Sequence, residues 1–478
     1  MKAGFYTADI TMPIGYEMAG GYLKAFSQRI MGPLKIRAAV FSDGKAKTAF
    51  AVVDTSSFDD RFVADVLAEL KDRFKLEFDA NIIAASHVHT GGLLRTSNVP
   101  ILKEMLAPEV FDRLETASMP DRVECYYWMC ISHCASAIAE AYYRMEDARI
   151  SVGRGHEAGR IFNRRLRLKD GREYTHPGKM NPDIVDFAGP VDPDVNVLGA
   201  WREDGSLIGC LINYGCHGTT MCGTKGSHGD WFQFTDEVIH KLLGEDVGTV
   251  ILNGPCGDVT QVNNMTPESD FGERVARELG GRVGAEAYKV LLSSPKRDDA
   301  TLDFAHKVIS IPKRKPSAEH VREAVEKLMK ALPSESEEST FARNTVIADA
   351  LCRKEPLCPK DVTAVRIGDA AIVTCQAELF CQLGLDLKAK SKFPFTFICT
   401  LANGSTGYVP TLKAFDPVTG GGYETRLTPG RLDIHAGDIM VENAAELLNS
   451  LSEQTPPKPV EFTPRKLWSY GANRPELD

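Results

Sequence analysis

The sequence has no apolar run near the roughly 20 residues needed to cross a bilayer, so no stable membrane insertion is expected. It also lacks a basic excess, since 56 Lys and Arg residues stand against 65 Asp and Glu residues, for a net charge of -9. A nucleic-acid partner is therefore not expected, because no surplus positive charge can neutralise phosphates. The N-terminal segment shows no basic stretch followed by an apolar one, so we expect no secretory signal.

Cysteine spacing of the zinc-finger kind is missing as well. Several of the 12 cysteines, such as Cys210, Cys375 and Cys399, lie inside apolar runs, where a thiol packs as a small hydrophobic side chain. Cys130 and Cys134 have no second pair at the spacing of a zinc site. Free thiols without an export signal indicate a reducing compartment, so we predict a cytoplasmic location.

The length and composition are those of a globular protein with a large core. The chain has 478 residues, of which 43% are hydrophobic and 25% are charged. No internal repeat or low-complexity linker marks a boundary. We therefore assign residues 1–452 to one domain that includes a helical excursion over 93–147, and residues 453–478 to a Pro-rich polar tail that wraps the surface. The sequence does not indicate an oligomeric state.

The chain repeatedly passes from an apolar strand to a short polar loop. Lys47–Val53 and Asn81–Ala85 are of strand type, and apolar side chains recur with helical spacing between them. A helix that connects two strands implies that they pair in parallel. The pattern of an apolar strand followed by a polar loop or turn recurs, with strands at 207–214, 247–252, 370–375 and 395–401. We expect an α/β fold with three α/β/α layers, a mixed, largely parallel central sheet, and a site at the carboxyl ends of its strands.

The segment 81–92, NIIAASHVHTGG, is the most informative of these. His87 and His89 are two residues apart, and such side chains project from the same face of a strand. They could be two ligands of one metal ion, or a ligand and its catalytic neighbour, or ordinary polar loop residues. His217, which follows the strand 207–214, is a further candidate for a nitrogen ligand. A hydrogen-bonded loop histidine is the alternative interpretation of His217.

Two further polar side chains follow apolar strands. Glu378 lies at a predicted strand-to-helix turn among apolar neighbours, where a buried carboxylate is costly unless it is paired, caps the helix or binds a cation. Favourable placement at the helix N-terminus, through the helix dipole, is the alternative. Tyr408 lies in a glycine-rich loop and, taken alone, is typical of a packed aromatic residue rather than a ligand.

Together these motifs resemble the neutral/alkaline ceramidase family of zinc-dependent amidases. SHVHTGG at 86–92 is similar to the family's Ser-His-Thr-His-Ser-Gly-Pro, and the resemblance covers most of residues 1–450. The other matching segments follow in family order: Gly32–Gly44, Asp54, Asn163-Arg164, Val191–Asp194, Cys216–Met221, Gly257-Asp258, the Glu378 turn and Gly421–Glu424.

The resemblance implies roles for individual residues. One zinc ion per chain would be held by His87, His217, Glu378 and Tyr408. His89 would activate the zinc-bound water or hold the developing oxyanion, while Arg164 and Tyr423 would bind the substrate carbonyl. We also expect contacts with the substrate from Asp54, Asp258, Thr260 and Trp231. The chemistry is coherent, because zinc lowers the pKa of bound water to about 7 and a nearby histidine can accept its proton.

Departures from the family pattern bear on the substrate. Gly92 replaces a proline, the loop after Asp258 lacks the family's Pro-Asn, and Trp231 and Phe232 stand where the family has a smaller turn. The family's immunoglobulin-like C-terminal domain is also not expected. We expect Trp231, Phe232 and the excursion to narrow the mouth of the site.

The sequence therefore predicts a zinc-dependent hydrolase that cleaves an amide, or else an ester or lactone, in a small polar or amphipathic substrate. A true ceramidase that acts on lipid is the first alternative. A metal-stabilised binding protein without turnover is the second.

Overall fold

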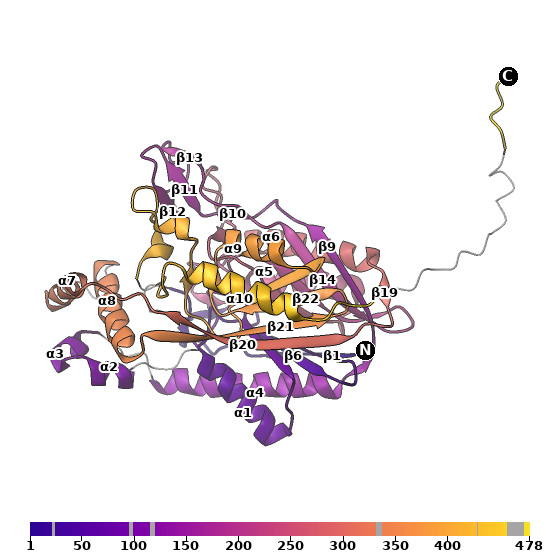
Figure 1. Ribbon diagram of the computed structural model, residues 1–478, viewed down its shortest axis with the longest axis horizontal. Helices are drawn as coiled ribbons and strands as arrows, with labels where there is room; N and C mark the ends of the chain where they lie inside the picture. The colour runs from indigo at the N-terminus through magenta and orange to yellow at the C-terminus, as the bar shows by residue number, and fades with distance from the viewer. Residues whose placement is uncertain (22–23, 95–98, 115–119, 331–336, 428, 457–472) are drawn as a thin grey trace.

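The structure is a computed structural model that describes residues 1–478 apart from 22–23, 95–98, 115–119, 331–336, 428 and 457–472. Most of the predicted tail, 453–478, therefore lies outside the described residues. Within the described part of the chain, three large sheets carry the architecture (Figure 1).

The strands of each large sheet come from one stretch of the chain, apart from short edge strands. The first sheet has the order β7-β6-β5-β1-β8, which are Ala80–Ala85, Lys47–Val53, Lys35–Ser42, Lys2–Asp9 and Glu146–Asp147. The second has the order β17-β15-β14-β9-β19, which are Gly248–Asn253, Leu207–Tyr214, Asp194–Trp201, Arg149–His156 and Lys296–Arg297. The third has the order β20-β21-β22-β24, which are Leu302–Pro312, Leu357–Ile367, Ala370–Cys375 and Phe395–Thr400.

Each large sheet contains one parallel pair, and its other neighbours run antiparallel. The parallel pairs are β6–β7, β15–β17 and β22–β24. They are joined by crossover helices α1 (Asp60–Phe74), α5 (Asp230–Leu243) and α9 (Cys381–Lys390). The predicted α/β class is confirmed. The sheets differ from the expected single, largely parallel one. Parallel neighbours require a crossover connection, and within each large sheet one such helix joins adjacent strands.

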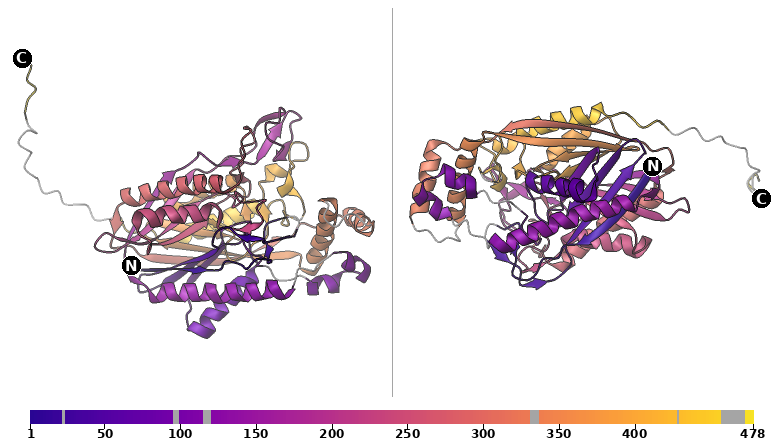
Figure 2. Two further views of the ribbon diagram at one scale, coloured as in Figure 1. Left: turned by 180° about the vertical axis from the view of Figure 1, so that it is seen from behind. Right: turned by 90° about the horizontal axis from the view of Figure 1, so that it is seen from below.

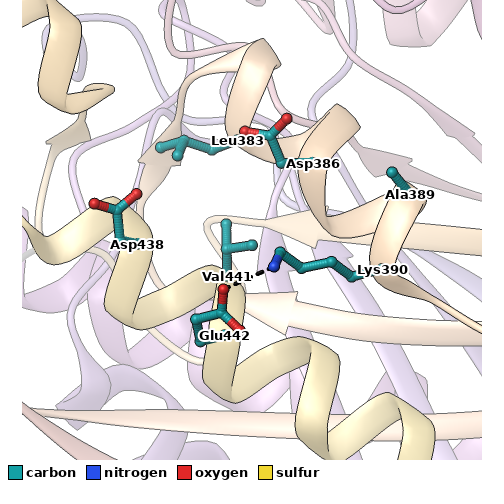
Figure 3. A pocket seen from close by; sticks show the side chains of 7 residues that line it. All are labelled: Leu383, Asp386, Ala389, Lys390, Asp438, Val441 and Glu442. Atoms are coloured by element: carbon teal, nitrogen blue, oxygen red, sulfur yellow. Dashed lines mark ion pairs between the residues drawn. The ribbon is translucent and has the colours of Figure 1, made fainter.

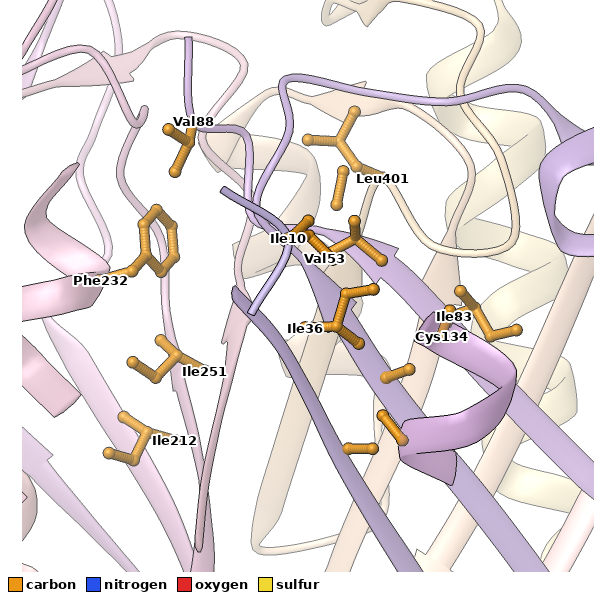
Figure 4. Close-up of a cluster of buried hydrophobic side chains, with 14 of the residues drawn as sticks. Ile10, Ile36, Val53, Ile83, Val88, Cys134, Ile212, Phe232, Ile251 and Leu401 are labelled. Atoms are coloured by element: carbon orange, nitrogen blue, oxygen red, sulfur yellow. The ribbon is translucent and has the colours of Figure 1, made fainter. Parts of the chain in front are cut away.

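Alternate side chains along the strands face two different cores. On β5, Ala39 and Phe41 face a core shared by all three sheets, whereas Ala38 and Val40 face helices. The outer faces are covered by α1 and α4 (Pro120–Tyr143), by α5 and α6 (Glu273–Ser293), and by α9 and α10 (Ala436–Ser450) (Figures 1 and 2). Figure 4 shows this outer packing, with Ile83 beside Cys134 of α4 and Ile251 beside Phe232 of α5. Full burial of each such side chain contributes about 1.5–3 kcal/mol.

The expected excursion divides into two parts. Its first helices, α2 (Val99–Met105), α3 (Pro108–Phe111) and η1 (Asp112–Leu114), pack with α7 (Ala318–Met329) and α8 (Glu337–Lys354) at one end of the molecule (Figure 1). Its long helix, α4, instead packs against β1 and β5 of the first sheet. None of the described helices combines the length and the apolar character needed to span a membrane.

Short strands and turns connect these layers. The two-stranded pairs are β2 (Glu17–Met18) with β3 (Ala25–Phe26), β4 (Arg29–Ile30) with β16 (Gly226–Ser227), β10 (Phe162–Asn163) with β18 (Val259–Thr260), and β23 (Glu378–Leu379) with β25 (Tyr408–Val409). A three-stranded sheet contains β11 (Arg165–Leu168), β12 (Glu173–Thr175) and β13 (Ile184–Phe187). The turns η2 (Leu412–Phe415) and η3 (Tyr423–Thr425) follow β25.

Candidate metal centre

Loops and short strands beyond the parallel pairs bring the predicted ligands to one place. His87 follows β7, His217 follows β15, and Glu378 on β23 follows β22. Tyr408 on β25 follows β24, and the parallel pairing of β23 with β25 sets it opposite Glu378. A bridge between Val88 and Gly218 ties the two histidine loops together. The site therefore forms at the carboxyl ends of strands from three different sheets.

The four side chains point toward a common centre. Oε2 of Glu378 lies 3.2 Å from Nε2 of His87 and 3.5 Å from Nε2 of His217. The hydroxyl of Tyr408 lies 3.3 Å from Nε2 of His217. All four residues are buried. Three ring nitrogens, one from each of His87, His89 and His217, also lie within 4.8 Å of one another. His89 is therefore close enough to be a ligand as well.

Hydrogen bonds from His87 and His217 to backbone carbonyls determine which ring nitrogen faces the centre. Nδ1 of His87 donates to the Ser56 carbonyl at 2.7 Å, and Nδ1 of His217 donates to the Cys256 carbonyl at 2.5 Å. Each Nε2 is then an unprotonated acceptor, the arrangement found in metal-binding histidines. Nε2 of His87 and Oε2 of Glu378 thus face each other as two acceptors, each without a hydrogen-bond partner among the described residues. A cation between them would bind both lone pairs and remove the repulsion between the two acceptors. Nitrogen and oxygen donors fit zinc.

Burial sets the charge of these groups. Burial and the neighbouring Arg164 lower the pKa of His217 to about 3. The pKa of His89 also falls well below its usual range, through burial and the nearby His87 and His217. Burial alone would raise the pKa of Glu378, but the two facing histidines hold it well below its usual range. At neutral pH His89 and His217 are therefore neutral and the carboxylate of Glu378 is ionised, as metal binding requires.

His89 has different surroundings from His87. It is half-buried, its backbone N–H donates to the Gly218 carbonyl at 3.0 Å, and its Nε2 has no partner among the described residues. Gly20, in the turn between β2 and β3, lies directly against its ring. A Cβ at Gly20 would come within 2.5 Å of Cγ of His89, and the φ of Gly20 is +94°. Nothing in the local pattern around Gly20 indicates this contact, so sequence reasoning missed it.

Arg164 reaches the same centre from the junction of β10 and β11. Its Nη1 lies 3.3 Å from Nε2 of His217, and its guanidinium lies 5.1 Å from the centre of the Tyr408 ring. Burial lowers the pKa of Arg164, but Tyr408 and Glu424 outweigh that effect and raise it, so the side chain stays charged. Its buried Nη2 has no partner among the described residues. Tyr423 lies beside them, with its ring centre 5.6 Å from that of Tyr408.

Comparison with known proteins supports the same architecture. No protein-family model matches the sequence, and no curated protein matches it. Solved structures that match the fold include neutral ceramidase from Pseudomonas aeruginosa, with a TM-score of 0.68, and a ceramidase complexed with C2, with a TM-score of 0.66. Each is 16% identical, and each match covers 94% of this chain and 74% of the other. This chain has the neutral ceramidase fold.

Within this ceramidase fold, the four expected substrate contacts are buried, and the side chains of three of them make hydrogen bonds within the protein. Asp54 accepts hydrogen bonds from Nη1 of Arg37 at 3.0 and 3.1 Å. Asp258 accepts from the Cys381 N–H and from Nδ2 of Asn163, both at 2.7 Å, and burial raises its pKa to about 6. Thr260 donates to Gln261 at 2.9 Å. Substrate contact by Asp54, Asp258, Thr260 and Trp231 stays a prediction.

The aromatic residues expected at the mouth of the site face the core instead. Trp231 and Phe232 are both 0% exposed and stack on each other with ring centres 3.7 Å apart. The reason is that α5 turns its apolar side toward the second sheet, where Trp231 meets Tyr214. The glycine at position 92 is explained by packing, because a Cβ there would come within 2.2 Å of the Tyr126 ring. Since α4 supplies Tyr126, a proline would not fit at this position of this chain.

A groove elsewhere on the molecule does not belong to this centre. It has a volume of about 390 Å³ and lies between α9 and α10 (Figure 3). Its charged residues include Lys390 and Glu442, which pair at 2.8 Å. It shares no lining residue with the metal centre.

Proposed function

We propose that the protein is a zinc-dependent hydrolase, similar to the neutral ceramidases, that cleaves an amide in a small polar or amphipathic substrate. An ester or lactone is the alternative bond. The supporting observation is the convergence of His87, His217, Glu378 and Tyr408, with two buried acceptors facing each other at 3.2 Å. Two buried acceptors in this arrangement favour a cation between them.

Zinc at this centre would polarise the substrate carbonyl and lower the pKa of a water molecule. His89 is neutral, because burial lowers its pKa, and its free Nε2 can accept the proton of the attacking water and later transfer it to the leaving group. Nη2 of Arg164, which has no partner in the described part of the chain, is offered to the carbonyl oxygen, where negative charge develops. Tyr423 would be a second donor to that oxygen.

A ceramidase that acts on lipid is the second candidate. The structural likeness to two ceramidases favours it. So does a set of exposed apolar side chains in the N-terminal segment that also carries Gly20: Ile14 at 59%, Ile30 at 55% and Phe26 at 37% exposure. Such a surface could receive an apolar chain.

We further propose a small-molecule substrate and a cytoplasmic location. All 12 cysteines are unpaired in the structure, which supports a reducing compartment.

The test combines metal analysis with an activity screen. Purified wild-type protein should contain about one zinc per chain. His217→Ala should lose it, whereas the control His435→Ala should not, because His435 is an exposed residue before α10. The zinc-loaded protein is then assayed with N-acyl amines, N-acyl amino acids, esters, lactones and a ceramide.

The results separate the alternatives. Turnover of a small amide supports the proposal, and comparable turnover of long-chain ceramide favours the lipid enzyme. Zinc without turnover of any of these would indicate a binding protein. Absence of any transition metal, or full zinc content in His217→Ala, contradicts the metal centre.

A further inference from the structure

Glu424 is a fully buried carboxylate beside the metal centre. It lies on η3, directly after Tyr423, and is 0% exposed. Its Oε1 accepts a hydrogen bond from Nε of Arg164 at 2.7 Å. Its Oε2 accepts from Nη1 of Arg165 at 3.0 Å and from Oγ1 of Thr175 at 2.7 Å. These donors offset the cost of burying the charge, because charge-assisted hydrogen bonds are among the strongest in proteins.

The contact with Arg164 determines how that side chain can point. A guanidinium is planar, so a bond to Nε restricts where Nη1 and Nη2 lie. In this orientation Nη1 lies 3.3 Å from Nε2 of His217, while the buried Nη2 has no partner among the described residues. Without Glu424, the guanidinium would lose its closest carboxylate and could rotate toward Glu378.

A neighbouring carboxylate provides a matched comparison. Glu173 is 6% exposed and pairs with Nη2 of Arg165 at 2.8 Å. Arg165 therefore lies between two carboxylates, Glu173 and Glu424, and also donates to the Gly421 carbonyl at 2.7 Å. Glu424 accepts hydrogen bonds from both Arg164 and Arg165, whereas Glu173 accepts one from Arg165.

We propose that Glu424 is a positioning residue, which holds Arg164 so that Nη2 is available to the oxygen of the substrate carbonyl. It acts through Arg164 and does not itself contact the substrate. The inference rests on the proposed function, in which Arg164 stabilises the charge that develops on that oxygen.

The experiment compares Glu424→Gln with Glu173→Gln, each alone and in an Arg164→Met background. Zinc content, Tm, kcat and KM are measured with the best substrate from the screen. Glu424→Gln should keep its zinc and lower kcat by about 10–100-fold with a smaller change in KM, whereas Glu173→Gln should change kcat less than about 3-fold. In the Arg164→Met background, Glu424→Gln should cause no further loss, because the residue that it positions is gone.

Binding of acetate, a carboxylate that resembles a hydrolysis product, gives a readout without turnover. Calorimetry should show that Arg164→Met and Glu424→Gln weaken acetate binding alike, and that Glu173→Gln does not. If Glu424→Gln does not fold, Glu424→Asp takes its place, since it keeps the charge but withdraws it from Arg164.

Three results would overturn the inference while the proposed function stands. They are wild-type kcat in Glu424→Gln, an equal loss in Glu173→Gln, and an additive loss in the Arg164→Met background. A wild-type protein that neither turns over an acyl substrate nor binds acetate would overturn both.

Discussion

His87 and His89 come from the same strand end, but their environments suit different tasks. His87 is buried, with Nδ1 bonded to the Ser56 carbonyl, and its φ of 71° is in the left-handed region. Such backbone strain costs about 1–3 kcal/mol and is found mainly at functional sites. His89 is half-buried, and its Nε2, which has no hydrogen-bond partner among the described residues, can exchange a proton. This contrast favours His87 as a ligand and His89 as the proton carrier.

We therefore predict that His89→Ala keeps its zinc but loses about 10²–10⁴-fold in kcat, the usual contribution of a general acid or base. Metal analysis and steady-state kinetics on the same preparation measure both quantities. His87→Ala is the comparison and should lose zinc. If His89→Ala lost the metal instead, the proximity of all three histidines would mean that His89 is a ligand.

At the scale of elements, the small β2–β3 pair supports the ring of His89. Its turn brings Gly20 against His89, whereas Ala19 donates to the Gly91 carbonyl at 2.8 Å. The short pair is thus attached to the histidine loop by backbone contacts. A change at Gly20 should therefore displace His89 and leave the buried His87 in place.

Gly20→Ala should lower kcat by about 10-fold or more while zinc content stays at the wild-type level, because the new methyl group displaces the His89 ring. Gly44→Ala is the matched control. Gly44 has a similar φ of +87°, compared with +94° for Gly20, but no atom of the described residues lies within 4 Å of its Cβ position. Both variants carry the backbone penalty of about 1 kcal/mol, so equal kcat values in the two would refute the contact argument.

At the scale of the whole molecule, the metal centre joins loops from three sheets. Binding of an ion there would stabilise the folded chain, because an unfolded chain cannot assemble ligands so far apart in sequence. We predict that a strong chelator lowers the Tm of the wild-type protein. At free zinc about 100 times the Kd, the contribution of the ion is about 2.7 kcal/mol. The Tm of His217→Ala should not respond to the chelator. An equal fall in the Tm of this variant would mean that the chelator removes a metal ion from a different site.

A buried ion-pair network also connects two sheets. Asp236 of α5, which covers the second sheet, pairs with Lys35 of β5 in the first sheet at 2.6 Å and lies 3.5 Å from Nε of Arg37. Burial would raise the pKa of Asp236, but Arg37 and Lys35 outweigh it and hold the pKa at about 2, below its ordinary 3.8. The pairing therefore stabilises the fold above about pH 4, and this stabilisation is lost as the pH falls toward 2.

Urea unfolding at pH 7, 5 and 3.5 measures this contribution. Asp236→Asn should lower the free energy of unfolding by about 2 kcal/mol at pH 7, with a smaller difference at pH 3.5. Asp246→Asn, at an exposed position, is the control and should change the free energy of unfolding little at any of these pH values. A loss for Asp236→Asn that does not shrink on acidification would contradict the assigned pKa.

The amino-acid sequence alone determined the alternation of apolar strands with polar loops, and hence the α/β class. These are local properties, since strand and helix periodicities are legible in short windows. Motif order added His87, His217, Glu378 and Tyr408 as a candidate set, and the structure brings these four side chains together.

Only the tertiary structure decided the rest, because pairing and packing depend on residues far apart in the chain. The division of the strands into three sheets follows from which strands pair with each other. Trp231 turned inward because α5 had an apolar face to bury, and Gly20 and Glu424 acquired importance only through contact with His89 and Arg164. No window of sequence contains both members of such a contact.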